Sequence, residues 1–374
     1  MIKVIKDNFN YSRYIYNKAL ETWNILYQEY QKDPSAPKPN HYLVRNTLVA
    51  NKEDWERGLS SRVLQTSVRQ VERSFKNFWN PNMPNHKKPK FKRKKNESFI
   101  QSYTTDRVSI KNGKLFLDKA RGYQGAFFGI RMAEQPGFYT KLKAATIIKK
   151  VDGYYAALNY DFPEVNFIIK DDNKELITGV DVNVGHFNYK EDGNFKEVQT
   201  FTPKLKELYQ KVNYYQKVLS KKVYNSKNYQ KARAKLRLIY QRIKNIQSEI
   251  TNQFVSKLIK NYHFVVIEDL AVNQMMMNKQ IKSIHRSLFG QFKDKMITKV
   301  NSNVILAHQF YPSTQRCSNC GEVKKGEDKI GLSGNKKHKT NHSQYHCYSC
   351  YIHLDRDENA VDNLIDYGKN YLKI

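Results

Sequence analysis

The four cysteines of this chain lie close together near its C-terminal end, as the pairs Cys317–Cys320 and Cys347–Cys350. Each pair has C-x-x-C spacing, which lets one turn bind a metal ion through two thiolates, and two such pairs complete a tetrahedral structural zinc site. The alternatives are two disulfides or a redox-active pair. We expect zinc, because the sequence shows no secretory signal and a redox motif needs no matching second pair.

Three acidic residues stand at the boundaries of apolar segments far apart in the sequence. Asp181 and Glu268 each end a short apolar run, and Asp357 precedes the apolar positions of a C-terminal helix. Taken singly, each acid could cap an element or form a salt bridge. Taken together, they favour a metal-dependent nuclease, because carboxylates bind Mg²⁺ and two such ions roughly 4 Å apart support phosphoryl displacement.

The net charge points to a polyanionic partner. The 374 residues contain 65 Lys and Arg against 35 Asp and Glu, a formal charge of +30, and aromatic residues make up 13%. Clustered cations interleaved with aromatic rings suit nucleic acid, which offers phosphates to bind and bases to stack on. Seven of nine positions in one run are basic, which predicts a nucleic-acid-binding loop, or alternatively a nuclear localisation signal: Lys87, Lys88, Lys90, Lys92, Arg93, Lys94 and Lys95.

Hydrophobic periodicity indicates how these residues are positioned. Helical spacing predicts helices before residue 80, and alternating patterns with an Asn-Gly and an Asp-Gly turn predict a small β-barrel or curled sheet from about 99 to 162. A near-heptad pattern predicts an antiparallel helical hairpin with its tip near residues 225–227. The remaining predictions are strands at 176–182, 264–270 and 303–307, a hairpin after the first of them, and helices at 283–300 and from 357 onward. No apolar run is long enough to span a membrane.

The order of several motifs resembles the TnpB family, the RNA-guided nucleases of insertion sequences related to compact type V CRISPR effectors. The motifs that carry the resemblance are Gly179-Val-Asp181, Val266-Ile-Glu268-Asp-Leu, Tyr311-Pro-Ser, Cys317-Ser-Asn-Cys320-Gly, Cys347 to Cys350, and Asp355-Arg-Asp357-Glu-Asn359-Ala. Ser12-Arg-Tyr-Ile-Tyr-Asn-Lys-Ala19 and Pro89-Lys-Phe-Lys-Arg-Lys-Lys95 also resemble the family, so that the similarity extends over nearly the whole chain.

The resemblance implies a multidomain α/β protein. Its main part would be a RuvC-like RNase H fold with an inserted four-cysteine zinc ribbon, preceded by a small β-barrel (wedge) domain and a helical recognition segment. The implied boundaries are 1–8 and 97–173 for the wedge barrel, 9–96 for the recognition segment with its basic loop, 174–310 for the nuclease core with its helical hairpin, 311–352 for the zinc ribbon, and 353–374 for the last helix of the core.

The resemblance also implies an activity, Mg²⁺-dependent cleavage of double-stranded DNA next to a short adjacent motif. A guide RNA from the end of a transposable element would direct the cleavage. Asp181, Glu268 and Asp357 would be the catalytic ligands of a two-ion Mg²⁺ site, the cysteines would bind structural Zn²⁺, and Asp355 would cap the last helix. The protein would be a monomeric ribonucleoprotein of the bacterial cytoplasm, associated with the nucleoid when bound to DNA. The alternative is a nuclease-inactive, RNA-guided transcriptional repressor of the same family.

The sequence departs from the family pattern in three places. It begins almost at the Ser12–Ala19 motif, where relatives have an additional strand and helix of the wedge domain. Asn183 and Tyr351 occupy positions where glycine is usual. Since glycine often serves a backbone with positive φ, we expect Tyr351 to distort the second cysteine turn slightly.

Overall fold

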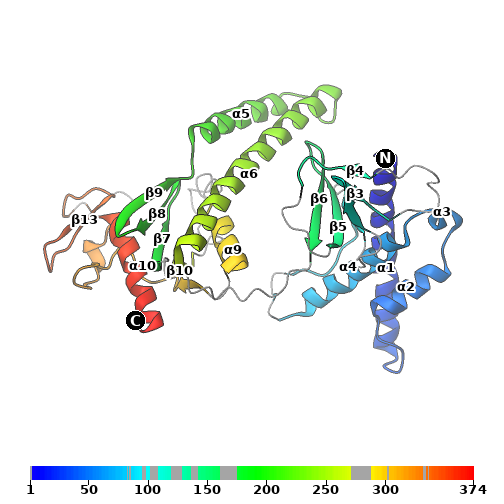
Figure 1. Cartoon of the computed structure of the whole chain (residues 1–374), viewed down its shortest axis with the longest axis horizontal. Coiled ribbons are helices and arrows are strands. Elements are labelled where there is room, and N and C mark those ends of the chain that lie inside the picture. Colours follow the sequence, from blue (N-terminus) through cyan, green and yellow to red (C-terminus); the bar gives the residue numbers. More distant parts are fainter. Residues whose placement is uncertain are drawn as a thin grey trace. The chain divides into compact units, whose positions relative to one another are not determined.

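The computed structural model describes residues 2–81, 83, 86–94, 98–101, 108–118, 129–135, 142–160, 175–270, 288–300, 303–331, 334–335 and 337–374. The chain divides into two compact units, residues 1–167 and 168–374, whose elements are labelled in Figure 1. Among the described residues, no helix has the length and apolar character needed to cross a membrane.

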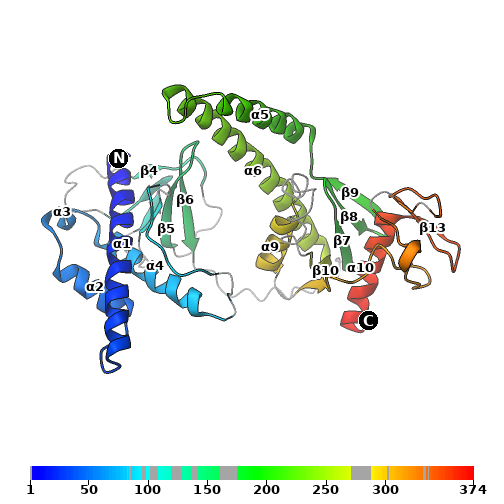
Figure 2. The ribbon, with the colours of Figure 1, turned by 180° about the vertical axis from the view of Figure 1, so that it is seen from behind.

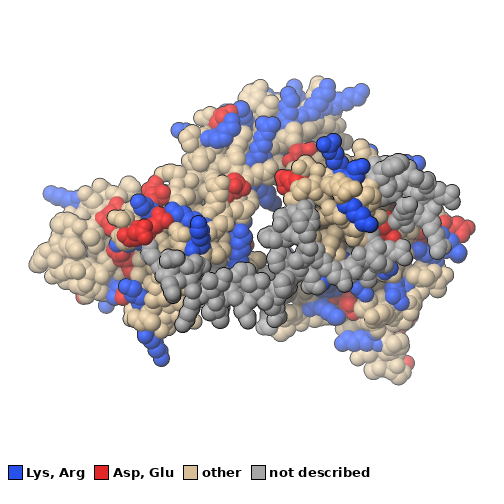
Figure 3. Space-filling model, in the orientation of Figure 1, with Lys and Arg blue, Asp and Glu red and all other residues tan. Residues whose placement is uncertain are grey.

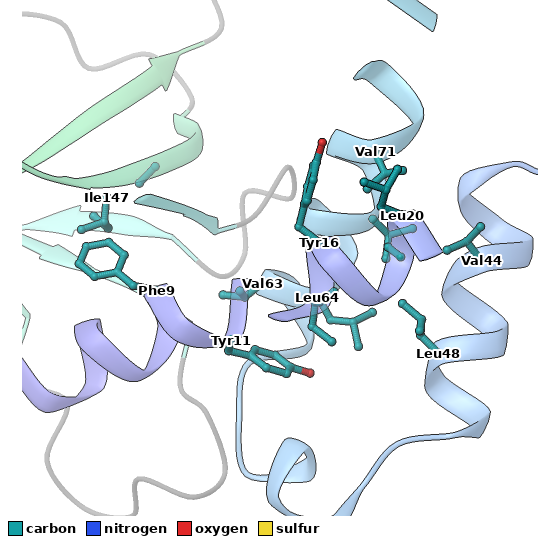
Figure 4. Close-up of a cluster of buried hydrophobic side chains, with 14 of the residues drawn as sticks. Phe9, Tyr11, Tyr16, Leu20, Val44, Leu48, Val63, Leu64, Val71 and Ile147 are labelled. Atoms are coloured by element: carbon teal, nitrogen blue, oxygen red, sulfur yellow. The ribbon is translucent and has the colours of Figure 1, made fainter. Parts of the chain in front are cut away.

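The first unit begins with helices, as the sequence predicts. They are α1 (Ile2–Lys32), α2 (His41–Ala50), α3 (Asp54–Arg57) and α4 (Ser61–Trp79). Asn40 and Ser60 cap α2 and α4 with side-chain oxygens that accept backbone N–H groups. Apolar residues at helical spacing bury one stripe of each helix: Leu20 of α1 lies in the same cluster as Val44 of α2 and Val71 of α4 (Figure 4).

Among the described residues of the first unit, six strands form two sheets. Strands β1 (Ser98–Gln101), β5 (Leu142–Lys149) and β6 (Tyr154–Tyr160) form one sheet, and β2 (Ser109–Lys111), β3 (Lys114–Phe116) and β4 (Ile130–Arg131) form the other. Both predicted hairpins are present, with Asn112 and Gly113 at positive φ in the β2–β3 turn. Within the described residues the strands do not close into the predicted barrel. Residues 2–8, assigned to that barrel from the sequence, form the first turns of α1 instead.

A five-stranded sheet is the centre of the second unit, in the order β11-β10-β7-β8-β9. Strands β7 (Glu175–Val182), β10 (Tyr262–Glu268) and β11 (Val304–Ala307) run parallel, and β8 (His186–Glu191) and β9 (Asn194–Gln199) continue from β7 as an antiparallel meander. The predicted strands therefore exist, and the pairing of β7 with β10 unites segments more than 80 residues apart in the sequence.

Helices cover both faces of this sheet (Figures 1 and 2). Helices α6 (Lys227–Asn261) and α9 (Phe289–Val300) pack on the face that includes Val180 and Ile267. Helix α10 (Arg356–Leu372) packs on the opposite face, against Ile177 and Val266. Glycines allow this close approach: a Cβ on Gly179 would lie 2.7 Å from the carbonyl oxygen of Val361, and one on Gly368 would lie 2.4 Å from Ile177.

Helix α5 (Pro203–Ser220) and α6 form the predicted antiparallel hairpin. Their seam is apolar, with Leu205, Leu208 and Val212 packed against Ile239 and Ile243. The outer surface is basic, and Figure 3 shows many of its Lys and Arg side chains on one face. Residues 203–261 contain 15 Lys and Arg but two acidic residues, which makes this hairpin a strong source of positive potential.

The cysteine-containing module lies between β11 and α10. It includes a short 3₁₀ helix (Gly326–Asp328) and the antiparallel pair β12 (Gln344–His346) and β13 (His353–Asp355). Tyr345 and Ile330 are buried beside Cys317 and Cys347, so the module has a small core of its own. Strand β13 leads directly into α10, which returns the chain to the sheet of the second unit.

Candidate functional site

Asp181 and Glu268 are neighbours at the carboxyl ends of two parallel strands. The register aligns Val180 of β7 with Ile267 of β10, one residue before each acid. Because side chains alternate between the faces of a strand, both carboxylates point away from the α6–α9 face, on which Val180 and Ile267 lie. They therefore lie on the same face as α10.

Helix α10 brings the third acid to these two. Asp355 caps the helix, since its Oδ1 accepts hydrogen bonds from the backbone N–H groups of Asp357 (2.8 Å) and Glu358 (3.2 Å). The predicted capping role of Asp355 is thus confirmed, and Asp357 lies in the first turn. Two β8 residues contact its Oδ2: the Asn188 Nδ2 donates at 3.1 Å, and the His186 Nε2 lies at 3.4 Å.

The three carboxyl groups have different electrostatic environments. Asp181 is 5% exposed, and burial together with the nearby Glu268 and Asp357 raises its pKa to about 7. Burial also raises the pKa of Glu268, and a hydrogen bond from Ser313 opposes that rise. The pKa of Asp357 is lowered, chiefly by its hydrogen bond with His186. A bound cation would relieve the repulsion between these neighbouring acids.

The donor set fits a hard divalent cation. Carboxylate and amide oxygens are the ligands that Mg²⁺ prefers, and the buried Oδ1 of Asn188 has no hydrogen-bond partner among the described residues. The carboxyl oxygens of the acids are less tightly gathered than the cysteine thiols. Within the described part of the chain, the thiols form the single His, Cys, Asp or Glu cluster at metal-ligand spacing.

The four cysteines meet at one point, as their spacing predicts. Their sulfur atoms all lie within 4.8 Å of one another. The Cys317 and Cys350 sulfurs are 3.7 Å apart, and those of Cys320 and Cys347 are 3.5 Å apart. Ligands about 2.3 Å from a tetrahedral zinc ion would be separated by about 3.8 Å. The cluster is therefore of the right size and chemistry for a zinc ribbon.

The two cysteine turns have the same backbone design. The N–H of Cys317 donates to the carbonyl of Glu322, and that of Cys347 donates to Ile352. In each turn the residue after the second cysteine has positive φ, 80° at Gly321 and 59° at Tyr351. Tyr351 thus adopts the positive φ at which glycine is usual. The distortion predicted for this turn does not extend to its hydrogen bond, which is the same as in the first turn. Hydrogen bonds from Asn319 and the Ile352 N–H lower the pKa of Cys350 to about 6.

The basic loop contains two kinds of cation. Lys87, Lys88, Lys90, Arg93 and Lys94 are exposed, as a nucleic-acid-binding role requires. Lys92 instead points into the protein, where its Nζ donates to Gln70 at 2.9 Å and lies 3.9 Å from the centre of the Tyr16 ring. Burial lowers its pKa to about 8. Lys95 lies outside the described residues.

Four polar residues around the acids are not identified from the sequence as site residues. In the sequence, Asn183 is notable only as a departure from the family pattern. In the structure, its Nδ2 donates a hydrogen bond to Oδ2 of Asp181 at 2.7 Å. His186, Asn188 and Ser313 contact Asp357 or Glu268. The alternation of β8 places His186 and Asn188 on one face of that strand, which is the signal that could have revealed them as a pair.

Two family models match segments between residues 163 and 364. OrfB_IS605, described as a probable transposase, matches residues 163–279, which include Asp181 and Glu268. The Cas12f1-like TNB domain matches residues 289–364, which include the four cysteines and Asp357. The acids and the cysteines therefore lie within segments that known families share.

Two similar proteins span the chain almost completely, and a third covers part of it. A protein of Escherichia coli (strain K12) named "Putative RNA-guided DNA endonuclease InsQ" is 24% identical over 375 residues, covering 95% of this chain and 86% of that protein. One from Streptomyces pristinaespiralis, named "Putative RNA-guided DNA endonuclease", is 22% identical, covering 97% of this chain and 85% of that protein. "TnpB-like protein L79" of Acanthamoeba polyphaga mimivirus is 29% identical over 155 residues, covering 38% of this chain and 27% of that protein.

The fold is similar to that in a solved structure described as "Cryo-EM structure of the Cas12f1-sgRNA-target DNA complex". The TM-score is 0.55 at 13% sequence identity, over 97% of this chain and 81% of the other. At this identity the similarity concerns the fold alone.

Proposed function

The chain contains the OrfB_IS605 and Cas12f1-like TNB domains and is similar to TnpB-like proteins; on this basis, we propose that it is an RNA-guided, Mg²⁺-dependent endonuclease that cleaves double-stranded DNA. It acts next to a short adjacent motif and is encoded by a transposable element. The observation that carries the proposal is the convergence of Asp181, Glu268 and Asp357 on one face of the sheet.

In this proposal the second unit performs the chemistry. Its sheet, three parallel strands continued by an antiparallel meander, supports a RuvC-like core at 174–310 completed by a last helix at 353–374, with the zinc ribbon at 311–352 between them. A bound Mg²⁺ would supply activation of water and charge stabilisation at the leaving oxygen of the scissile phosphate. Asp181, Glu268 and Asp357 supply the carboxylate ligands. Asn183 favours the ionised form of Asp181, while His186 and Asn188 orient Asp357.

Nucleic acids are the proposed partners of the basic surfaces. The helical hairpin contributes 15 of the 65 Lys and Arg residues, and the exposed cations of the basic loop add a second site for phosphates. The two relatives named as RNA-guided DNA endonucleases support a guide RNA and a DNA target. Residues 97–173 would form the wedge domain and 9–96 the recognition segment.

The test begins with expression of the protein together with its flanking genomic DNA and sequencing of the RNA that co-purifies. The complex is then incubated with a duplex library in Mg²⁺, beside an Asp181→Ala variant. Cleavage that requires both the RNA and Asp181 is expected, and sequencing of the products reveals the adjacent motif. Guide-dependent binding without cleavage would replace the nuclease with the repressor, and the absence of co-purifying RNA would contradict both.

A further inference from the structure

The side chain of Glu268 has one hydrogen-bond partner among the described residues, the hydroxyl of Ser313. The Ser313 Oγ donates to Oε1 of Glu268, and Ser313 is 3% exposed. The contact joins the end of β10 to the segment between β11 and the first cysteine turn. Because a carboxylate so engaged loses the freedom to rotate, the hydroxyl determines how Glu268 presents its other oxygen, Oε2.

Ser313 is itself held by α10. Its carbonyl oxygen accepts a 2.8 Å hydrogen bond from Nδ2 of Asn363, a residue with no exposed surface. The same Nδ2 donates to the carbonyl of Arg316 at 2.6 Å, and the Asn363 Oδ1 accepts from the Arg316 guanidinium at 2.8 Å. Both N–H donors and the carbonyl oxygen of this buried amide are therefore used to fix the segment that carries Ser313.

A second buried asparagine attaches the first cysteine turn to the same helix. Asn359 lies one turn before Asn363 on α10 and also has no exposed surface. Its Oδ1 accepts from the Ser318 N–H at 2.9 Å, and its Nδ2 donates to the Arg316 carbonyl at 2.8 Å. Ser318 follows Cys317 directly. A shift of this cysteine turn would thus break its hydrogen bonds to Asn359, and, through Arg316, those to Asn363, the residue that also holds Ser313.

These contacts connect the cysteine cluster with the acidic site through short, buried links. They run from the Cys317 turn to Asn359 and Asn363, and from Asn363 through Ser313 to Glu268. Asp357 lies on the same helix, two residues before Asn359. The helix, the cysteine turn and Glu268 therefore take up their positions together. Polar groups buried at such a junction fit one geometry and are left unsatisfied in others.

We propose that Ser313 is the positioning residue of Glu268, and that Asn363 and the first cysteine turn hold it in place. The zinc module in this way sets the geometry of a catalytic carboxylate. The inference rests on the proposed function, since it takes Glu268 as a ligand of the divalent cation. The role of Ser313 resembles that of the hydrogen-bond partners that orient metal ligands in other sites. Substitution of such a partner typically weakens metal binding about 10-fold to 100-fold.

The experiment compares Ser313→Ala and Ser313→Thr with the wild-type chain. Binding of Mn²⁺ is measured by electron paramagnetic resonance, and cleavage is measured across a Mg²⁺ titration. Ser313→Ala is expected to weaken Mn²⁺ binding about 10-fold or more and to raise the Mg²⁺ requirement similarly. Ser313→Thr keeps the hydroxyl and is expected to restore most of both. Ser343→Ala is the matched control, because Ser343 is an exposed serine of the same module whose hydroxyl bonds to Asn341.

Asn363→Asp tests the link to α10, because it retains the size of the side chain but loses the donor to the Ser313 carbonyl. It is expected to weaken Mn²⁺ binding in the same direction as Ser313→Ala. Zinc content and melting temperature are measured for every variant. Loss of zinc or folding in Asn363→Asp would leave Ser313→Ala as the deciding variant, since that change removes one hydroxyl alone.

The outcomes separate this inference from the proposed function. If Asp181→Ala leaves Mn²⁺ binding and cleavage unchanged, the acidic site itself is wrong. If Asp181→Ala abolishes both while Ser313→Ala matches the wild type, the positioning role of Ser313 is overturned. Wild-type Mn²⁺ binding by a folded, zinc-containing Asn363→Asp would overturn the connection to the zinc module.

Discussion

The side-chain amide of Asn183 donates a 2.7 Å hydrogen bond to Oδ2 of Asp181. This bond favours the ionised carboxylate, because a donor stabilises the negative charge. It acts against burial and the two neighbouring acids, which together raise the pKa of Asp181 to about 7. A residue that departs from the family pattern is therefore in direct contact with a proposed catalytic acid.

Asn183→Ala should shift the pH dependence of cleavage. Without the donated hydrogen bond the pKa of Asp181 rises further, so a higher pH is needed to ionise it. We expect the acidic limb of the rate profile to move to higher pH, with smaller changes above it. Asn194→Ala serves as the control, because the Asn194 side chain bonds to a backbone carbonyl in the exposed β8–β9 turn. An unmoved acidic limb would show that Asn183 does not act through Asp181.

Asp181→Asn should stabilise the metal-free protein at alkaline pH. The folded-state pKa of Asp181 is about 7, above the value of about 3.9 expected for an unfolded chain. The folded state therefore binds the proton more tightly, and stability is lost as pH rises from about 4 to about 7. Thermal melting in a chelator should give a higher melting temperature for Asp181→Asn at pH 8, and no gain at pH 4.

Asp294→Asn provides the comparison for that measurement, because Asp294 is an exposed acid on α9. Its melting temperature should follow the wild type at both pH values. If Asp294→Asn also raised the melting temperature at pH 8, the gain in stability would come from the change in net charge rather than from the burial of Asp181.

Substitutions of Tyr351 should change stability according to their tolerance of positive φ. Tyr351 has φ of 59° and is 74% exposed, so removal of its ring sacrifices little packing. The left-handed conformation costs a residue with a Cβ about 1 kcal/mol or more. We expect the melting temperature to decrease in the order Tyr351→Gly, Tyr351→Asn, wild type and Tyr351→Val, with unchanged zinc content. A most stable Tyr351→Val would contradict the backbone argument.

The two kinds of lysine in the basic loop should behave differently in nucleic-acid binding. Replacing the exposed Lys87, Lys88 and Lys90 together by alanine removes cations that we propose bind phosphates. The salt dependence of binding should therefore become shallower by about 0.7 to 0.9 for each phosphate that is no longer neutralised. Lys92→Met should leave that slope unchanged, because Lys92 is directed toward Gln70 and Tyr16. Binding is measured at several salt concentrations, and equal slopes for the two variants would contradict this division.

Local patterns in the sequence are sufficient to predict most of the elements and to single out the cysteines and acids of the candidate sites. Hydrophobic periodicity predicts α4, the α5–α6 hairpin and strands β7 and β10, because each buries one stripe or run of apolar residues. The cysteine pairs predict their own cluster, since two residues of separation bring both thiols to one turn. The capping role of Asp355 is predictable for a similarly local reason, since it directly precedes an apolar helix.

Tertiary structure decided what depends on pairing between distant segments. The register of β7 on β10 makes Asp181 and Glu268 neighbours, and the packing of α10 on Gly179 brings Asp357 to them. Lys92 points inward because its side chain contacts Tyr16 of α1 and Gln70 of α4. Ser313 and Asn363 are separated by 50 residues. No pattern in the sequence around either residue indicates its contact with the other. The sequence alone determined which residues could do chemistry, whereas the fold decided which of them meet, because burial and register are properties of the packed chain.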